Sequence, residues 1–522
     1  MKPADLVAEC GAVLEPLETA ANAAWWNANV DASDETQQRR AESDLALSDA
    51  LADADAFAAV RAARAARADK DLDPLVAREL EVLLQGYTPN QVEPDLRRDI
   101  VELGSEIESR FARHRGAIDG TMVDDNEILD ILRTSDDVAQ RRAAWEASKS
   151  VGAEVADDVR ELVRRRNRAA ASLGYRDHFA LTLATTDFDE ERLFATLAEV
   201  DGITRAPFAE LKAGLDAQLA RRFRVDAGDL RPWHYDDPFF QDAPSSIGVD
   251  LDPYLHDADL EALTARSFGS MGLDVGGVLG RSDLTPRAGK VQHAFCIDVD
   301  RAGDVRVLTN NVPSERWAET MLHEFGHAVY FDGVGRDLPW LLRTMHLCVT
   351  EGVAMRCGRL VRDPQWLEQL AHVPAATVAE LAPQLRAAQR AYLLVFARWV
   401  LVMTHFERGL YAQPDADHDT RWWDLVERFQ LVHRPDGRAA PDWAAKIHIA
   451  AAPVYYHNYL FGELIASQLT DAFGGLVGDG DAGRALAERV FAPGASLRWD
   501  RLVEQATGTA LTPAAFAREV AV

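Results

Sequence analysis

Helical patterning runs through this 522-residue chain from end to end and limits the folds that it can adopt. Long stretches rich in Ala, Leu, Arg and Glu, such as 95–113, 137–172 and 376–408, place apolar residues three and four positions apart, as one face of an α-helix does. Strand-like runs are few, and 291–299 and 304–309, joined by a turn-prone segment, predict one hairpin. The sequence therefore predicts an all-α fold with one small hairpin.

Length and composition indicate one folded body. The chain is 48% hydrophobic and 27% charged, which is typical of a globular protein with enough apolar residues for a large core. It contains no internal repeat and no loop long or polar enough to act as a flexible tether. We predict a single domain over residues 1–522. This domain can consist of two lobes, each built from segments that alternate along the sequence.

The charge balance excludes several classes of partner. The chain has 84 acidic and 56 basic residues, a net charge of -28, which repels nucleic-acid phosphates and anionic membrane surfaces. This charge suits either basic peptide substrates or a saline habitat. The first twenty residues carry Asp5, Glu9, Glu15 and Glu18 where a signal peptide has an uninterrupted apolar run, so we expect a cytoplasmic protein.

The segment 320–330 contains an HExxH motif inside a helical pattern. Because His323 and His327 lie four positions apart, a helix brings both imidazoles to one face, one turn apart, as a shared zinc ion requires. Glu324 lies beside them and can take a proton from a water that zinc activates, then pass it to a leaving amine. The alternative is a half-exposed helix with two ordinary histidines.

A third protein ligand is needed, and Glu351 is the candidate. The chain breaks after the motif and restarts as a second apolar helix, 340–360, on which Glu351 lies 24 residues past His327. A carboxylate among apolar neighbours is unfavourable unless it is paired or binds a metal. The sequence predicts a His2Glu site for one zinc ion per chain; the alternative is a salt bridge from Glu351 to Arg343 or Arg356.

Further polar residues follow near the C-terminal end of the chain. Lys446 and His448 alternate with apolar residues, which in an extended segment points both side chains the same way. A helix expected to begin near Pro453 carries Tyr456 and Tyr459 on one face. A lysine here can hold a substrate carboxylate, while His448 and Tyr459 donate to an oxyanion. Ordinary core packing is the alternative for either tyrosine.

Taken together, these residues resemble the angiotensin-converting-enzyme family of zinc peptidyl-dipeptidases. The likeness includes the HExxH motif, the downstream glutamate, the Lys-x-His pair, the two tyrosines, and His293-Ala294 thirty residues before His323. It extends more diffusely to residues 24–27, 165–175, 422–423 and 441–448, and so spans nearly the whole chain. Enzymes of the thimet-oligopeptidase type share the fold and the HEFGH sequence, and they are the nearest alternative.

The resemblance implies a zincin-type fold in which two helical lobes flank a deep substrate channel with zinc near its floor. The strand and zinc motif would then fall within 290–360, and the substrate-binding and oxyanion segment within 441–470. The family's site residues correspond in this chain to the zinc ligands His323, His327 and Glu351, the general base and acid Glu324, the oxyanion donors His448 and Tyr459, the carboxylate-binding Lys446 and Tyr456, and the substrate-backbone partner Ala294 with His293 beside it.

The chain departs from the family pattern at four places. Met355 stands where the family has an aspartate that orients the site, and Asn458 replaces an arginine that binds chloride. One residue is inserted before the second tyrosine, so either Tyr455 or Tyr456 can take the first tyrosine's role. A glutamine that helps to hold the terminal carboxylate has no clear counterpart near 233–235.

The predicted function is that of a zinc metallopeptidase acting on short peptides. Release of C-terminal dipeptides is favoured by Lys446, since a cation at that place can hold the end of the chain. Internal cleavage of oligopeptides, as in the thimet type, is the first alternative. A helical peptide-binding protein without activity is the second, and the presence of Glu324 argues against it. The expected cofactor is zinc, and the expected partners are short peptides, with no nucleic acid and no membrane.

Overall fold

The computed structural model describes residues 1–66, 72–244 and 247–521. Its regular structure is almost entirely helical, so the prediction of an all-α fold is confirmed. The helices are α1 (Pro3–Val30), α2 (Asp34–Leu51), α3 (Ala54–Ala65), α4 (Pro74–Tyr87), α5 (Pro94–Arg113), α6 (Asp125–Thr134), α7 (Val138–Ser172), α8 (His178–Thr185), α9 (Glu190–Phe223), α10 (Asp252–Leu255), α11 (Leu260–Ser270), α12 (Gly276–Arg281), α13 (Glu315–Gly333), α14 (Leu347–Gly358), α15 (Pro364–Gln369), α16 (Ala375–Ala412), α17 (His418–Gln430), α18 (His448–Ala451), α19 (Tyr456–Phe473), α20 (Gly480–Leu486), α21 (Trp499–Thr507) and α22 (Ala514–Ala521).

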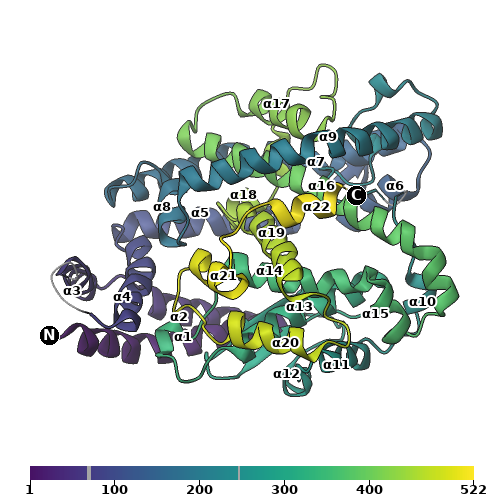
Figure 1. Cartoon of the computed structure of the whole chain (residues 1–522). Helices are drawn as coiled ribbons and strands as arrows, with labels where there is room; N and C mark the ends of the chain where they lie inside the picture. Colours follow the sequence, from purple (N-terminus) through teal and green to yellow (C-terminus); the bar gives the residue numbers. More distant parts are fainter. Residues whose placement is uncertain (67–71, 245–246, 522) are drawn as a thin grey trace.

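The long helices lie on either side of a central element. Figure 1 shows α7 and α9 crossing the upper part of the molecule and α13 and α14 in the lower part, with α19 between them. One large core extends from Leu103 to Val520 and includes the fully buried Trp145, Trp399 and Trp443. A smaller core joins α1, α3 and α4 to Leu341. Among the described residues, no helix is both long enough and apolar enough to cross a membrane.

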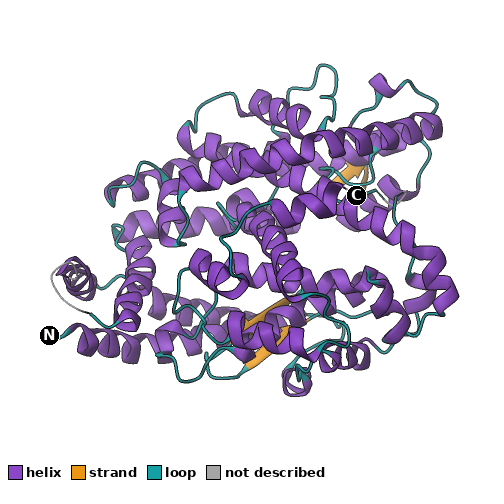
Figure 2. Cartoon of the chain, in the orientation of Figure 1, coloured by secondary structure: helices purple, strands orange, loops and turns teal. Residues whose placement is uncertain are grey.

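Two short hairpins interrupt the helices (Figure 2). The predicted one is present as β3 (Phe295–Asp298) paired antiparallel with β4 (Val305–Leu308), and it contacts α13. The second, β1 (Gly116–Ile118) with β2 (Thr121–Val123), was not predicted. Its turn is Asp119-Gly120, in which both residues have positive φ, and this dipeptide is a strong hairpin signal.

Glycines let the three helices around the predicted zinc site pack closely. A Cβ on Gly326 of α13 would lie 2.7 Å from Cα of Ala354 on α14. A Cβ on Gly462 of α19 would lie 2.8 Å from Cβ of Glu351. Such distances are too short for real carbon contacts, so any larger residue at either position would push the helices apart. The glycine in HEFGH therefore sets the spacing between α13 and α14.

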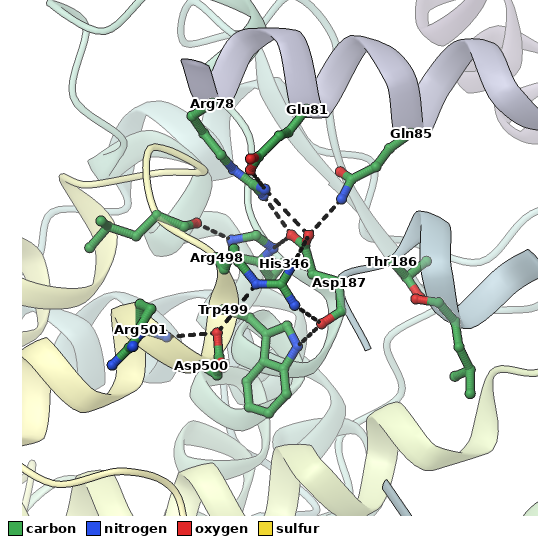
Figure 3. Close-up of polar contacts among 12 residues, drawn as sticks. Arg78, Glu81, Gln85, Thr186, Asp187, His346, Arg498, Trp499, Asp500 and Arg501 are labelled. Atoms are coloured by element: carbon green, nitrogen blue, oxygen red, sulfur yellow. Dashed lines mark hydrogen bonds and ion pairs between the residues drawn. The ribbon is translucent and has the colours of Figure 1, made fainter. Parts of the chain in front are cut away.

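A buried ionic network fixes the beginning of α14 (Figure 3). The carboxylate of Asp187 accepts hydrogen bonds from Nη2 of Arg78 at 2.6 Å, Nε2 of Gln85 at 2.6 Å and Nη1 of Arg498 at 3.2 Å. Nδ1 of His346, the residue before α14, lies 3.9 Å from the same carboxylate. Asp187 thus ties α4 and the start of α21 to the start of α14.

The second predicted helix, 340–360, is shorter than expected. A single 3-10 turn covers Trp340–Leu342, and the α-helix begins only at Leu347. The chain is turned away between them because Nε of Arg343 donates to the carbonyl oxygen of Leu338, and the imidazole of His346 bonds the carbonyl of Leu497. These tertiary contacts replace the helical hydrogen bonds that the apolar pattern predicts.

Candidate metal centre and substrate cavity

The three predicted zinc ligands lie together at the contact between α13 and α14. One potential ligand atom from each of His323, His327 and Glu351 lies within 4.8 Å of the others. Nε2 of His323 is 3.8 Å from Oε2 of Glu351, and the two imidazole rings have centroids 4.9 Å apart. Two imidazole nitrogens and one carboxylate oxygen at this separation are a donor set that suits zinc with one position left open.

The surroundings of Glu351 fit a metal better than a salt bridge. Glu351 is 6% exposed, and its Oε2 is buried without a hydrogen-bond partner among the described residues. Neither predicted alternative partner reaches it, since Arg343 bonds the carbonyl of Leu338 and Arg356 bonds the carbonyl of Gly474. A buried carboxylate oxygen without a partner is unfavourable, so the site fits a cation at this place.

Neighbouring residues orient the ligands. Nδ1 of His327 lies 2.6 Å from Oγ1 of Thr350, and the hydroxyl of Tyr455 donates to Oε1 of Glu351 at 2.9 Å. Metal-binding histidines usually donate their second nitrogen to such a partner, which fixes the ring and its tautomer. Met355, where the family has an aspartate, forms no polar contact of this kind with the described residues. The orienting contact comes instead from Thr350, which sequence reasoning missed.

Burial controls the protonation of the motif. It lowers the pKa of His323 to about 4 and that of His327 well below its usual value, which keeps both imidazoles in the neutral form that binds metal. Burial, together with the nearby Glu351 carboxylate, raises the pKa of Glu324 to about 8. A divalent cation at the site would favour the ionised form of both carboxylates.

A cavity of about 330 Å³ opens beside His323. Its walls include four residues predicted from the C-terminal segment, which are Lys446, His448, Tyr456 and Tyr459. The structure therefore brings the zinc motif and the C-terminal segment to one space. Tyr459 is close enough to Glu351 and Glu324 for both carboxylates to raise its pKa, after the larger effect of burial.

Lys446 and His448 reach the cavity by a different route from the one expected. They do not lie on an extended segment: Lys446 follows a 3-10 turn, Asp442–Ala445, and His448 begins the short helix α18. Nζ of Lys446 donates to Oε1 of Gln241 at 2.7 Å. Gln241 also lines the cavity and is therefore a candidate for the glutamine that had no clear counterpart near 233–235.

The two adjacent tyrosines, Tyr455 and Tyr456, contact different parts of the site. Tyr455 bonds Glu351, whereas the ring of Tyr456 lies 5.1 Å from that of His448 and 5.9 Å from Nζ of Lys446. Tyr456 is thus the residue beside the lysine, as the first-tyrosine role requires. Asn458 is buried and donates to the carbonyl oxygen of Tyr455 at 3.1 Å, so it supports the turn that places these rings.

His293 and Ala294 lie just outside the hairpin, because β3 begins at the next residue, Phe295. His293 is exposed, and neither residue is in the cavity wall. His293 is nevertheless near enough to His448 to help lower its pKa to about 4, after burial and Lys446. The pair therefore lies at the edge of the site.

Part of the chain is similar to a known peptidase family. The model of a peptidase family described as angiotensin-converting enzyme matches residues 3–225. No curated protein matches the chain. The matched segment ends before Gln241 and contains none of the predicted zinc ligands, so the match and the zinc motif are separate observations. They agree on the same type of peptidase.

Proposed function

We propose that this chain, whose residues 3–225 match the model of the angiotensin-converting-enzyme family of peptidases, is a zinc metallopeptidase that releases dipeptides from the C-terminus of short peptides. The observation that carries the proposal is that one cavity has in its wall both His323 of the candidate metal centre and the hydrogen-bonded pair of Lys446 and Gln241. A cation at a fixed place in the cavity can bind the end of a peptide and so determine which peptide bond lies beside Glu324.

The chain's own residues would divide the chemistry among them. His323, His327 and Glu351 would hold zinc, which supplies a Lewis acid that activates water and polarises a carbonyl group. Glu324 would accept a proton from the attacking water and deliver it to the leaving amine nitrogen. His448 and Tyr459 would donate hydrogen bonds to the carbonyl oxygen as negative charge develops there.

The C-terminal carboxylate of the substrate would bind to Lys446 and Tyr456, with Gln241 holding the lysine in place. Burial lowers the pKa of Lys446, while the carboxylates of Asp237 and Asp242 oppose that shift. A substrate carboxylate beside the ammonium would favour its charged form in the same way. This contact separates dipeptide release from internal cleavage, which does not need a free terminus.

The test compares one peptide with a free C-terminus and the same peptide as its C-terminal amide. We expect kcat/KM to fall by about ten- to a hundredfold for the amide, the loss typical of a charge-assisted hydrogen bond. Equal values for the two would favour the thimet-type internal oligopeptidase and would remove the carboxylate role of Lys446 and Tyr456.

The metal and base assignments need a second experiment. Glu324→Gln should keep zinc, measured by elemental analysis, and lose hydrolysis by at least about a hundredfold, because no group can then accept the proton from water. Unchanged hydrolysis in this variant would overturn the mechanism. A wild-type chain that binds peptides and zinc but cleaves none would be the inactive binding protein instead.

A further inference from the structure

Some charged side chains in the cavity wall have no partner of opposite charge among the described residues. Five charged side chains line it beside the histidine: Asp242, Glu319, Lys446, Arg359 and Glu463. Which of them already have partners decides what kind of ligand the cavity can accept, because a charge left without a partner in a concave site is unfavourable.

Two of the acidic groups are neutralised by arginines. Arg359 donates to the carboxylate of Glu463, and the two Nη atoms of Arg362 donate to the two oxygens of Glu319 at 3.0 and 2.9 Å. Each of these carboxylates therefore meets a guanidinium in a charge-assisted contact. Neither has a full charge left for a ligand.

One cation and one anion remain. Lys446 is hydrogen-bonded to Gln241, whose amide is neutral. Asp242 follows Gln241 in the chain, is exposed to the cavity, and forms no hydrogen bond or ion pair with any of the described residues. Lys446 and Asp242 are near enough for each charge to shift the pKa of the other group. Their nitrogen and oxygen atoms are nevertheless farther apart than the 4.0 Å of an ion pair.

The field around Asp242 favours a second cation. Desolvation by the cavity wall, the Asp237 carboxylate and, to a smaller extent, Glu319 raise its pKa, while Arg133 and Lys446 lower it, and the result is a pKa of about 6. Asp242, which has no direct partner among the described residues, therefore stands near the Asp237 carboxylate, whereas Arg362 offsets the charge of Glu319. A positive group of the ligand placed at Asp242 would relieve this repulsion.

We propose that the cavity selects peptides whose C-terminal residue is lysine or arginine. Such a residue carries a negative group for Lys446 and a positive group for Asp242. Its carboxylate binds Lys446, and its side-chain cation binds Asp242. Both groups line one cavity and are near enough for each to shift the pKa of the other, so one substrate residue can contact both. The inference rests on the proposed release of C-terminal dipeptides and names the substrate class that this cavity accepts.

The test uses two peptides that differ only in their last residue, lysine or the uncharged norleucine, which has a similar aliphatic side chain. The zinc-loaded wild-type chain should show a kcat/KM about ten- to a hundredfold higher for lysine, the range of a hydrogen bond to a charged group. Asp242→Asn should bring the ratio close to one. Because both rates come from the same preparation, a partly misfolded variant does not alter the ratio.

Two further variants sharpen the result. Asp242→Lys should invert the preference, so that a C-terminal glutamate is cleaved faster than a glutamine. Asp157→Asn, which changes a 99% exposed side chain on α7, is the matched control and should keep the lysine preference. Equal rates for lysine and norleucine in the wild type, or an unchanged ratio in Asp242→Asn, would overturn the proposal.

A binding measurement separates this inference from the proposed function. The dipeptides alanyl-lysine and alanyl-norleucine can be titrated into the zinc-loaded chain by calorimetry, and no turnover is needed. Tighter binding of alanyl-lysine that is lost in Asp242→Asn would support the charge selection even if the peptides were not hydrolysed. Hydrolysis of both peptides with equal binding of both dipeptides would leave the peptidase proposal standing and refute this one.

Discussion

Thr350 shows how a neutral residue can take over the orienting role of an acidic one. Its hydroxyl lies 2.6 Å from Nδ1 of His327, and its place directly before Glu351 puts it on the same turn of α14 as a predicted ligand. A hydroxyl oxygen can accept a hydrogen bond from the Nδ1–H group without adding a second negative charge beside Glu351. The metal centre would then carry one carboxylate ligand and the Glu324 base, but no third acid.

Thr350→Val tests this orienting role. The substitution keeps the side-chain shape and removes the hydroxyl, so zinc should bind about ten- to a hundredfold more weakly, as for other lost partners of metal ligands. Competition with a chromogenic chelator measures the affinity. Thr404→Val is a matched control, because the Thr404 hydroxyl is buried without a hydrogen-bond partner among the described residues. Equal zinc affinity in the two variants would contradict the role.

Tyr459 is the second residue with a specific expected effect. Its hydroxyl would act only when charge develops on the substrate, so Tyr459→Phe should lower kcat about ten- to a thousandfold and change KM much less. Steady-state kinetics on a peptide with a free C-terminus measure both constants. Tyr254→Phe, at a residue that is 37% exposed, is the control. A raised KM with unchanged kcat would mean that Tyr459 only binds substrate.

Lys149 is a buried cation that the proposed chemistry does not use. Its Nζ has no hydrogen-bond partner among the described residues and lies 3.0 Å from the centroid of the Phe239 ring. Burial lowers its pKa to about 7, against the opposing carboxylates of Asp442 and Asp237. The unfolded chain therefore binds more protons than the folded chain above that pH, and this group makes stability rise with pH between about 7 and 10.

Lys149→Met should reduce that pH dependence. Between pH 7.5 and 9 the wild-type free energy of unfolding should gain up to about 1.4 kcal/mol per pH unit from this lysine, and the variant should lack that part of the slope. The variant should also be more stable at pH 7 by about 2 kcal/mol or more, since a buried charge without an ionic partner is removed. Urea unfolding at several pH values measures both. Parallel curves for the two proteins would refute the assignment.

At the scale of elements, the sequence predicts the helices whose apolar residues recur at a regular helical spacing. The stretches 95–113, 137–172 and 376–408 appear as α5, α7 and α16 with ends within a few residues, because one apolar stripe on each meets the core. The residues of HExxH are likewise placed by the period of one helix. Local spacing is sufficient for such features, since the helix itself carries the side chains to their positions.

Contacts between distant segments were harder to predict. Gln241 and Lys446 are 205 positions apart, and no pattern in either segment shows that they meet. The pairing of Tyr455 with Glu351 depends on how α19 packs against α14, which the close contact at Gly462 determines. In these cases the position is set by packing between elements rather than by the sequence around the residue.

The Asp187 network gives a prediction at this scale. Asp187→Asn keeps the size of the side chain but leaves Arg78, whose side chain is 6% exposed, without its buried carboxylate partner. Breaking a buried ion pair in this way should lower the free energy of unfolding by about 3–5 kcal/mol. Urea unfolding at pH 7 measures the loss. Asp157→Asn, which breaks only an exposed pair, should change it by less than about 0.5 kcal/mol.

For the whole molecule, the net charge of -28 gains a function if the substrates are cationic. A strongly negative molecule raises the local concentration of positive peptides and speeds their association, and added salt screens this attraction beyond a Debye length of about 10 Å at 0.1 M. The saline-habitat explanation predicts no such dependence on substrate charge. The two explanations can therefore be separated by varying salt and substrate charge together.

Raising the ionic strength from about 0.01 to 0.3 M should lower kcat/KM for a peptide ending in lysine by about three- to tenfold, because encounter with the acidic molecule slows. The peptide ending in norleucine should change much less, since it lacks the attracted charge. Repeating the series with sodium acetate in place of sodium chloride separates screening from an effect of chloride itself. An equal fall for both peptides would mean that salt acts on the protein, and the acidic surface would then have no part in selecting substrates.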